Sequence, residues 1–428
     1  MDNQRRSRSG TQVRTVPPMR PRKADPAMGA SSSAKKKKNR SGDFIKSSDI
    51  VRVRGGIDRP MLVIIVLLLC FGSVMVFSAS YAFSYQKYGD SYHYIKQHLL
   101  YAGVGLLAMA AAIRFDYRWM RKITIPVFLA VSGLLVLTPM VGLVKNATRR
   151  WIVIGGIRFQ PSELMKLALV LMLAWYFSRY QKYVTDYSNF ARSSIYGIAI
   201  PFGIVVFVCI LIALESHFSC MIIMFLIGAV VIFAGGARKI WFLIAGGGAA
   251  VAAAFAISLS GYARSRVDVW LHPEKYMTGT IDDKIYQTVQ GLYAVGSGGF
   301  LGVGLGNSRQ KHLFVPEPQN DFIFSIICEE LGFVGAMAVL ILFLLFTWRG
   351  FYIALKAPDT FSSLVVVGIV SKTTIQAILN IAVVTSVIPN TGISLPFFSY
   401  GGTALTMLLG EMGIVLSISR YSYESARK

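Results

Sequence analysis

The stretch Glu317–Trp348 reads EPQNDFIFSIICEELGFVGAMAVLILFLLFTW and contains the change from polar to apolar sequence that decides the fold. A polar segment, 261–320, precedes Asp321, and an uninterrupted apolar run begins at Phe322. Because about 20 apolar residues span the hydrocarbon of a bilayer as a helix, the run predicts a transmembrane helix with Asp321 at its end. A carboxylate at such a boundary can meet substrate on one side and a low-dielectric wall on the other, a setting that favours a functional site. The alternative is that Asp321 only caps the N-terminus of a helix.

The composition of the whole chain indicates a membrane protein. Of its 428 residues, 54% are apolar and only 15% are charged, and the mean hydropathy is +0.53. These values exclude an ordinary soluble globular domain and predict an all-α polytopic membrane protein with about ten transmembrane helices. We predict spans at 60–82, 95–113, 124–144, 161–178, 195–214, 218–235, 239–259, 322–347, 360–388 and 400–418.

Lysine and arginine predict the orientation of these spans. Basic residues gather in the N-terminal tail, in the connections 114–122 and 179–192, at Arg238 and Lys239, at Arg349 and Lys356, and at the C-terminus. All of these positions fall on one side of the ten-span model, which we predict to be the cytoplasmic side, with both termini inside. Segments 145–160, 261–320 and 389–399 then lie outside, and 261–320 is the large extracellular loop between the seventh and eighth helices.

One external segment is basic against this trend. Lys145, Arg149, Arg150 and Arg158 all lie in or beside segment 145–160. A basic cluster on the outer side suggests an anionic ligand there, such as a pyrophosphate or a lipid head group, although a short basic loop is often only solvated.

The chain divides into a tail, a membrane domain and a short end. Residues 1–57 are basic and rich in Pro and Ser, which predicts a disordered cytoplasmic tail lying along anionic lipids rather than a nucleic-acid-binding arm. Residues 58–420 form the transmembrane domain, and 421–428 form a second, short cytoplasmic tail. No cleavable signal peptide is expected, because the first apolar run is long enough to span the membrane.

The positions of the cysteine and histidine residues indicate neither a disulfide framework nor a metal site. Cys70, Cys209, Cys220 and Cys328 lie in or beside apolar spans, where small-hydrophobe packing is expected. The five histidines are dispersed and lack the paired spacing of metal ligands.

Charged residues also occur within predicted spans. Glu163 and Lys166 are three residues apart and share one face of a helix that is otherwise apolar. They either neutralise each other and fix helix packing, or they shape a polar cavity that reaches the outer face at Arg150 and Gln160. Further intramembrane carboxylates, whose partners the sequence does not assign, are Glu329, Glu330 and Glu411.

The outer loop contains a glycine-rich run, GSGGFLGVGLG at 296–306. Glycine at this density lets the backbone approach a ligand or another helix closely, so the loop is interpreted as a binding surface. The alternative is a tight re-entrant turn buried against the helices.

Four motifs resemble the signature sequences of the SEDS family, the bacterial cell-wall proteins that include FtsW, RodA and SpoVE. They are NATRRW at 146–151, FQPSELMK at 159–166, PEPQNDFIF at 316–324 and PNTGISLPFFSYGG at 389–402. The resemblance extends from about residue 58 to 420. It implies a ten-helix fold and a peptidoglycan glycosyltransferase of the cell membrane that polymerises lipid II beside a class B penicillin-binding protein and other division proteins.

The resemblance also assigns expected roles to residues. Asp321 matches the essential loop aspartate and would accept the proton of the acceptor sugar's 4-hydroxyl. Glu163 and Lys166 match the buried ion pair, and Arg149, Arg150 and Gln160 match the outer polar set. Further expected substrate-binding residues are Arg264, Arg266, Gln287, Gln290, Ser297, Lys311, Glu317 and Ser399. No tightly bound cofactor is implied, because the lipid pyrophosphate is the activated donor; a divalent cation could assist the leaving group, at a site that the sequence does not define.

The chain departs from the family pattern after the fifth span. Residues 215–220 read ESHFSC where many relatives have a Pro-Asp-x-Gly sequence, so the role of that second aspartate is missing or passes to Glu215 or His217. The basic tail and the loop sequence NTGIS favour the division or sporulation type over the elongation type. Two other functions stay open: a lipid II flippase, which would need a similar charged cavity, and a non-catalytic division scaffold.

Overall fold

The computed structural model describes residues 50–52, 55–145, 148–154, 157–215, 217–247, 268, 270–272, 283–421 and 423–425. Most of the predicted N-terminal tail, the second half of the span predicted at 239–259, and Arg264 and Arg266 lie outside the described residues.

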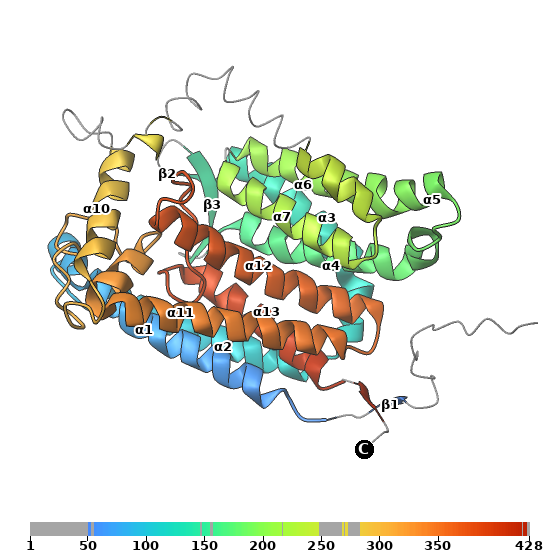
Figure 1. Ribbon diagram of the computed structural model, residues 1–428, viewed down its shortest axis with the longest axis horizontal. Coiled ribbons are helices and arrows are strands. Elements are labelled where there is room, and N and C mark those ends of the chain that lie inside the picture. The colour runs from blue at the N-terminus through green and yellow to red at the C-terminus, as the bar shows by residue number, and fades with distance from the viewer. Residues whose placement is uncertain are drawn as a thin grey trace, which may run out of the picture. The chain divides into compact units, whose positions relative to one another are not determined.

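Long helices make up most of the described chain (Figure 1). Their bounds are α1 Arg59–Tyr88, α2 His93–Arg114, α3 Tyr117–Val141, α4 Pro161–Val184, α5 Phe190–Ser194, the π-helical turn η2 Ile195–Ala199, α6 Ile200–Leu214, α7 Phe218–Ala234, α10 Asp283–Ser297, α11 Ile323–Leu355, α12 Thr360–Val384 and α13 Gly402–Ser419. A further helical segment covers 239–247.

Nine of the ten predicted spans coincide with helices of the structure, and the tenth, 239–259, is helical over its described part. Seven helical segments among the described residues are long and apolar enough to cross a membrane, judged by length and composition: 59–88, 93–114, 117–140, 190–214, 323–355, 360–384 and 402–419. Helix α7 is apolar but shorter, and α4 carries Glu163 and Lys166 near its start. The span predicted at 239–259 is described only over 239–247.

Short strands that the sequence did not predict occur in two places. The end of the segment predicted as a disordered tail contains β1 (Ile50–Arg52), which pairs antiparallel with β5 (Tyr423–Ser425) near the C-terminus. The span predicted at 124–144 ends earlier, because Gly142 is extended and the chain enters an antiparallel three-stranded sheet. Its strands are β2 Leu143–Lys145, β3 Thr148–Ile154 and β4 Ile157–Phe159.

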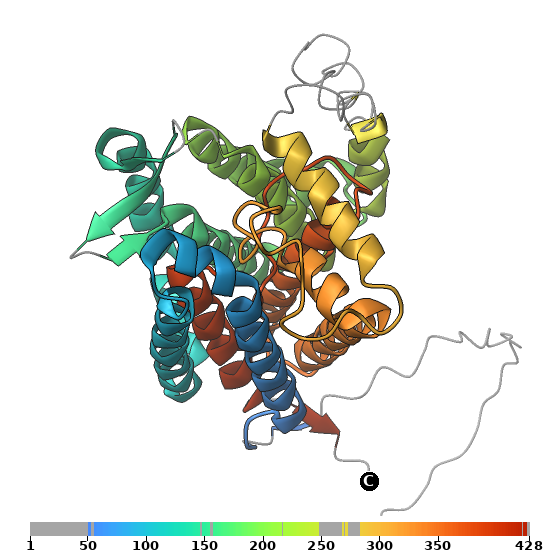
Figure 2. The ribbon, with the colours of Figure 1, turned by 90° about the vertical axis from the view of Figure 1, so that its left-hand side faces the viewer.

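The predicted outer and inner connections lie at opposite ends of the helices. In Figure 1 the outer segments, which include α10 and the β2 to β4 sheet, lie toward the left, while α5, β1 and β5 lie toward the right. Figure 2 looks onto the outer end, with the sheet at left, α10 at right and the α1 to α2 turn between them. The loops expected to share one side of the membrane therefore gather at one end.

Helices α12 and α13 are the most buried of the candidate spans. Within their most apolar windows, 72% of α12 and 67% of α13 are buried, against 22% of α2. Helix α12 packs against α4, α7 and α11, and α13 packs against α2. Residues carried by α12 and α13 are thus enclosed by other helices, whereas much of α2 is left to face lipid.

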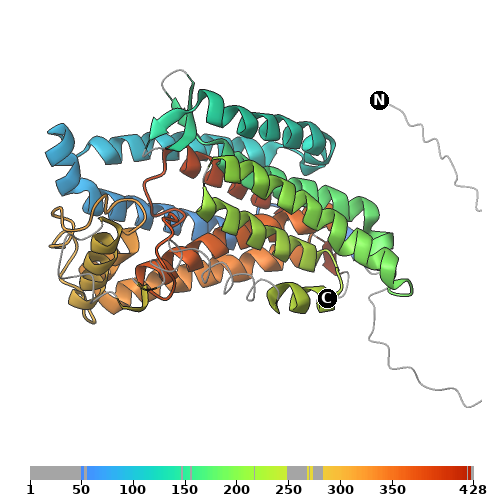
Figure 3. The same cartoon turned by 90° about the horizontal axis from the view of Figure 1, so that it is seen from above.

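The apolar run that begins at Phe322 is a broken helix rather than the uninterrupted one predicted. Gly332 has φ 66° and ψ −161°, a conformation that leaves backbone groups on either side without helical partners. Segment 298–306 lies against the break and supplies those partners. Figure 3 shows the loops between α10 and α11 gathered at one end of the bundle. The bonds run from Val303 N to Glu329 O (2.9 Å), Gly304 N to Glu330 O (3.0 Å), Phe333 N to Gly299 O (2.9 Å) and Val334 N to Phe300 O (3.2 Å). The glycine-rich run therefore folds back against the broken helix, as the alternative reading expected, although several of its side chains, such as Leu301, stay exposed.

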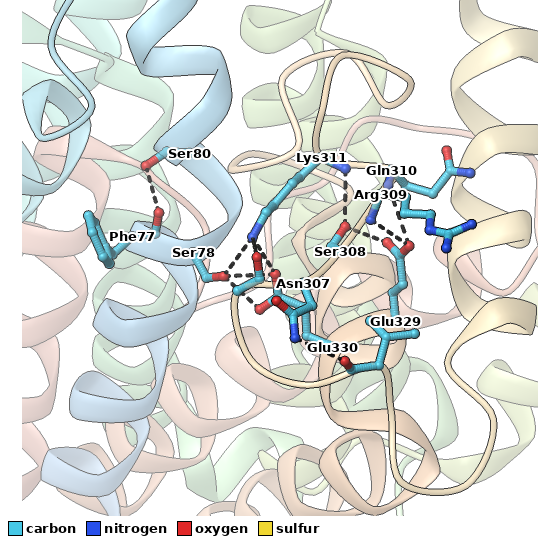
Figure 4. Close-up of polar contacts among 12 residues, drawn as sticks. Phe77, Ser78, Ser80, Asn307, Ser308, Arg309, Gln310, Lys311, Glu329 and Glu330 are labelled. Atoms are coloured by element: carbon cyan, nitrogen blue, oxygen red, sulfur yellow. Dashed lines mark hydrogen bonds and ion pairs between the residues drawn. The ribbon is translucent and has the colours of Figure 1, made fainter.

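Buried charges hold the chain that follows this segment in place, at residues 308–311 (Figure 4). Glu330, which is fully buried, forms an ion pair with Lys311 at 2.8 Å and accepts a hydrogen bond from Ser78 of α1 at 2.6 Å. Glu329 accepts bonds from the Ser308 hydroxyl and from the Arg309 backbone N–H, the latter at 2.9 Å. The chain that leads to Asp321 is thus attached to both α1 and α11.

We expect Lys311→Met to lower the melting temperature of the detergent-solubilised protein, because it leaves the Glu330 carboxylate buried without its cation. Removing one partner of a buried pair costs about 3–5 kcal/mol, whereas replacing both partners with apolar side chains is often nearly neutral. The double variant Lys311→Met with Glu330→Met should therefore recover most of the lost stability. A Lys311→Met protein that melts at the wild-type temperature would contradict this account of the pair.

Candidate active-site cavity

A cavity of about 930 Å³ opens at the outer end of the bundle. Its lining comes from the α1 to α2 turn, β3, α4, α7, the chain before α11, α12 and the start of α13. Six of the residues proposed from the sequence line it together: Arg150, Gln160, Glu163, Lys166, Glu317 and Asp321. Convergent polar side chains in a concave site of this size are typical of a binding or active site.

Asp321 is held through its backbone rather than its side chain. The Asn380 side-chain amide donates to Asp321 O at 2.7 Å and to Ile393 O at 2.6 Å, which ties the chain before α11 to the loop that follows α12. The Ser399 hydroxyl donates to Asn320 O at 2.7 Å and supports the neighbouring residue. Phe322 is the N-cap residue of α11 and forms no side-chain cap bond, so the alternative reading of Asp321 as a helix cap is wrong.

The Asp321 carboxylate faces the cavity without a counter-ion. Among the described residues, none forms an ion pair or a hydrogen bond with its oxygens. Burial, reinforced by the nearby Glu317 carboxylate, raises the pKa of Asp321 to about 6. Gly392 has φ 67°, and a Cβ there would lie 3.3 Å from Asp321 Oδ2, so glycine at this position keeps the carboxylate uncrowded.

Glu317 is held beside Asp321 in an uncommon backbone conformation. Its φ is 45°, which is costly for a residue with a side chain, and its Oε2 accepts a bond from the Asn320 side-chain amide at 2.7 Å. The Gln287 amide donates to Pro316 O at 3.1 Å and supports the same turn from α10. The strained turn fixes a second carboxylate in the cavity lining.

Charged side chains of α4, α12 and α13 form buried ion pairs. Lys166 Nζ lies 2.7 Å from Glu163 Oε1, and Lys166 is almost completely buried. Lys372 of α12 and Glu411 of α13 form a second buried ion pair. The structure thereby assigns the partners that the sequence left open: Glu411 pairs with Lys372, and Glu330 pairs with Lys311 outside the cavity lining.

The segment that departs from the family pattern also reaches the cavity. His217 lines it, with Nδ1 3.4 Å from the Gln160 side-chain nitrogen. Burial, together with nearby Arg150 and Lys166, lowers the pKa of His217 to about 4, so its imidazole is neutral at pH 7. Glu215 is buried beside Arg150, whose Nε donates to Glu215 O at 3.2 Å, and burial raises the pKa of its carboxyl to about 7. Of the two candidates, His217 is the one that lines the cavity.

Of the other residues proposed from the sequence, the described Lys311, Ser297, Gln287, Gln290 and Ser399 are not among the residues that line the cavity. Lys311 forms an ion pair with Glu330. Ser297 is exposed, and its hydroxyl donates to Ala294 O within α10. Gln290 lies half-buried on α10, and Ser399 acts on the Asn320 backbone. The backbone of Arg149 lies in β3, opposite Val144.

Sequence reasoning missed an aromatic cluster in the cavity lining, which consists of Tyr88, His93, Tyr94 and Tyr400. These residues lie at the end of α1, at the start of α2 and just before α13. In the sequence, three of them could have been found from the many aromatic residues between the first two predicted spans. Tyrosine at the end of a span is also typical of membrane interfaces, and this hides a cavity role.

The described residues contain no group of three or more His, Cys, Asp or Glu side chains that could hold a metal ion. Within the same part of the chain, the four cysteines are unpaired.

Apolar helices around a polar, charged cavity define a multi-pass membrane protein with an internal site. The sequence-family model of the FtsW, RodA and SpoVE cell cycle proteins matches residues 59–424, and the chain belongs to this family. It is a multi-pass protein of the cytoplasmic membrane.

Individual relatives agree with this assignment. The stage V sporulation protein E of Bacillus subtilis is 40% identical over 369 residues, covering 85% of this chain and 97% of the relative. A probable peptidoglycan glycosyltransferase FtsW of Geobacter sulfurreducens is 36% identical over 365 residues, covering 85% and 95%.

Solved structures share the fold. One from work on the structural coordination of polymerization and crosslinking by a peptidoglycan synthase complex matches with a TM-score of 0.70 at 26% identity, covering 85% of this chain and 98% of the other. The crystal structure of Thermus thermophilus RodA matches with a TM-score of 0.62 at 25% identity, covering 86% and 98%.

The Asn380 bridge leads to a stability prediction. Asn380→Leu keeps the volume of the side chain but leaves Asp321 O and Ile393 O without their donor, so it should lower the free energy of unfolding by about 1–3 kcal/mol. Thr373→Val is the matched control on α12, because the buried Thr373 hydroxyl bonds only to Ile369 O of its own helix. Thermal unfolding in detergent measures both variants. Equal melting temperatures for the two would show that the bridge contributes nothing.

Proposed function

We propose that the chain is a peptidoglycan glycosyltransferase that polymerises lipid II into glycan strands, with Asp321 as the general base. One observation carries the proposal: a carboxylate that has no counter-ion among the described residues, with a pKa raised to about 6, faces a polar cavity at the outer end of the bundle. Such a group is ionised at pH 7 and is more basic than an ordinary aspartate, which suits general-base catalysis.

The proposed reaction is a displacement at the anomeric carbon of the donor sugar. The acceptor's 4-hydroxyl oxygen forms a bond to the anomeric carbon of the donor, and its proton passes to the Asp321 carboxylate. The bond between the anomeric carbon and the phosphate oxygen breaks, and its electron pair leaves with undecaprenyl pyrophosphate. Proton transfer to a positioned base contributes about 10²–10⁴-fold to the rate of such a step.

Cations of the lining would stabilise the leaving group. Arg150 and Lys166 both line the cavity, and positioned positive charge is most effective where negative charge develops. We retain Arg149, Arg264 and Arg266 as proposed further contacts to the pyrophosphate. We propose no tightly bound cofactor, since the lipid pyrophosphate is the activated donor.

We also propose a class B penicillin-binding protein as the partner that crosslinks the product. Support comes from the fold match to a structure described as a peptidoglycan synthase complex that coordinates polymerization and crosslinking. Relatives named FtsW and stage V sporulation protein E favour a role in division or sporulation, beside other division proteins. Anionic lipids are the proposed ligand of the basic tail, and no nucleic acid is proposed.

The decisive experiment is polymerisation of purified lipid II with and without the partner, comparing wild type with Asp321→Asn. The asparagine keeps the size of the side chain but cannot accept the proton, so the rate should fall on the order of 10²–10⁴-fold. Asp186→Asn, at an exposed aspartate of the α4 to α5 connection, should polymerise like wild type. A silent wild type, or an active Asp321→Asn protein, would favour lipid transport or scaffolding instead.

The pH profile tests the environment of the base. Because the base must be ionised, the rate should rise with pH through about 6 and then level off. The Glu317 charge disfavours the Asp321 carboxylate, so Glu317→Gln should lower the pKa of Asp321 and move the acidic limb to lower pH. Initial rates from about pH 4.5 to 8 show the shift even if Glu317→Gln also lowers the maximal rate. Superimposable limbs in wild type and Glu317→Gln would exclude this coupling.

A further inference from the structure

We propose that the aromatic cluster of Tyr88, His93, Tyr94 and Tyr400 is a saccharide-binding subsite that stacks on a pyranose ring of the substrate. This inference rests on the proposed function and adds to it the place in the cavity where a sugar binds.

The four rings form a connected aromatic surface in the cavity lining. Tyr88 stacks on His93 with ring centroids 3.9 Å apart and an interplanar angle of 18°. Tyr94 meets Tyr88 edge-on at 5.7 Å and Tyr400 edge-on at 4.9 Å. Because Tyr88 is 47% exposed, the cluster is not simply packing within the protein core.

The cluster is attached to the chain that carries the proposed base. Tyr400 N donates to Gln319 O at 2.8 Å, two residues before Asp321. The Tyr400 hydroxyl donates to Gln97, whose amide nitrogen lies 3.1 Å from His93 Nε2. Gln97, Asn320 and Asp321 also line the cavity. Aromatic faces and hydrogen-bonding groups therefore occur side by side.

This combination matches the two kinds of surface that a sugar offers. A pyranose ring has an apolar face of C–H groups, which packs against an aromatic ring, and an edge of hydroxyls, which needs polar partners. An isoprenoid chain would use the rings but would leave the neighbouring Asp321 carboxylate without a polar partner, at a cost. The cations proposed for the pyrophosphate, Arg150 and Lys166, come from other elements, β3 and α4. Lys87 also lines the cavity, with Nζ 5.6 Å from the Tyr88 ring centroid, where it can donate to sugar hydroxyls. The observations therefore favour the saccharide as the occupant.

Tyr92 is a nearby tyrosine in the position expected of a residue at the membrane–water interface. Tyr92 lies between Tyr88 and Tyr94 in sequence, is 54% exposed and stacks on Phe77 at 5.6 Å. It is not among the residues that line the cavity, which is the arrangement expected of a residue at the membrane boundary. Tyr92 therefore provides a matched control.

The test compares Tyr88→Leu, Tyr88→Phe and Tyr92→Leu in the full-length protein. Lipid II affinity is measured directly, and the KM and kcat of polymerisation are measured with the partner present. Tyr88→Leu should weaken lipid II binding and raise KM about three- to tenfold with little change in kcat, the range expected for an aromatic contact. Tyr88→Phe keeps the ring and should retain more affinity than Tyr88→Leu. Tyr92→Leu lies outside the cavity lining and should behave like wild type.

Undecaprenyl pyrophosphate, used as a competing ligand without the sugars, separates the possible occupants. Its affinity should be the same in wild type and Tyr88→Leu. Equal weakening of both ligands would place the lipid or pyrophosphate at the cluster and overturn the proposal, as would unchanged lipid II affinity in Tyr88→Leu. Because binding is measured directly, the result does not depend on Asp321. Tight lipid II binding without polymerisation would count against the proposed function alone.

Discussion

The break in α11 at Gly332 is the constraint on which the outer end of the structure depends. The break frees backbone groups from their helical partners, and each such group that is buried without a new partner costs several kcal/mol. Segment 298–306 supplies both the donors and the acceptors that the break leaves open. The helix and the turn are therefore stable only together. Since Asp321 lies between them in sequence, the same pairing fixes the chain that carries the proposed base.

Charge pairing distinguishes Asp321 from most buried carboxylates of the helices. Three of them, in α4, α11 and α13, have a lysine partner: Glu163 has Lys166, Glu330 has Lys311 and Glu411 has Lys372. Buried Glu329 is held instead by the Ser308 hydroxyl and the Arg309 backbone N–H. A buried charge without a partner is strongly disfavoured, so these pairs are needed for the helices to pack. Asp321 lacks such a partner within the described part of the chain, and its raised pKa is the physical consequence. At Asp321 the protein accepts that cost where a reactive carboxylate would be useful.

The sequence predicted the parts of this arrangement that depend on local composition. Span positions follow from long apolar runs, and Asp321 stood out because it lies where a polar segment meets such a run. The break at Gly332 was missed because a glycine inside an apolar helix is common, and only contact with segment 298–306 reveals its role. The partner of Glu330 was equally hidden, since it depends on how a glycine-rich loop folds back. Tyr88 and His93 escaped notice because their aromatic character has an ordinary explanation at a membrane boundary.

The distribution of burial also bears on the choice between a transferase and a carrier. A carrier must open its cavity alternately to both faces of the membrane, usually by moving one group of helices against another. Here the helices beneath the cavity are the most enclosed of the candidate spans, and α12 and α13 are joined by the buried Lys372 and Glu411 pair. Opening a path toward the inner face between these helices would separate that pair and leave two charges in a low-dielectric interior. A cavity closed in this way suits a site that receives its substrate at the outer face and performs the reaction there.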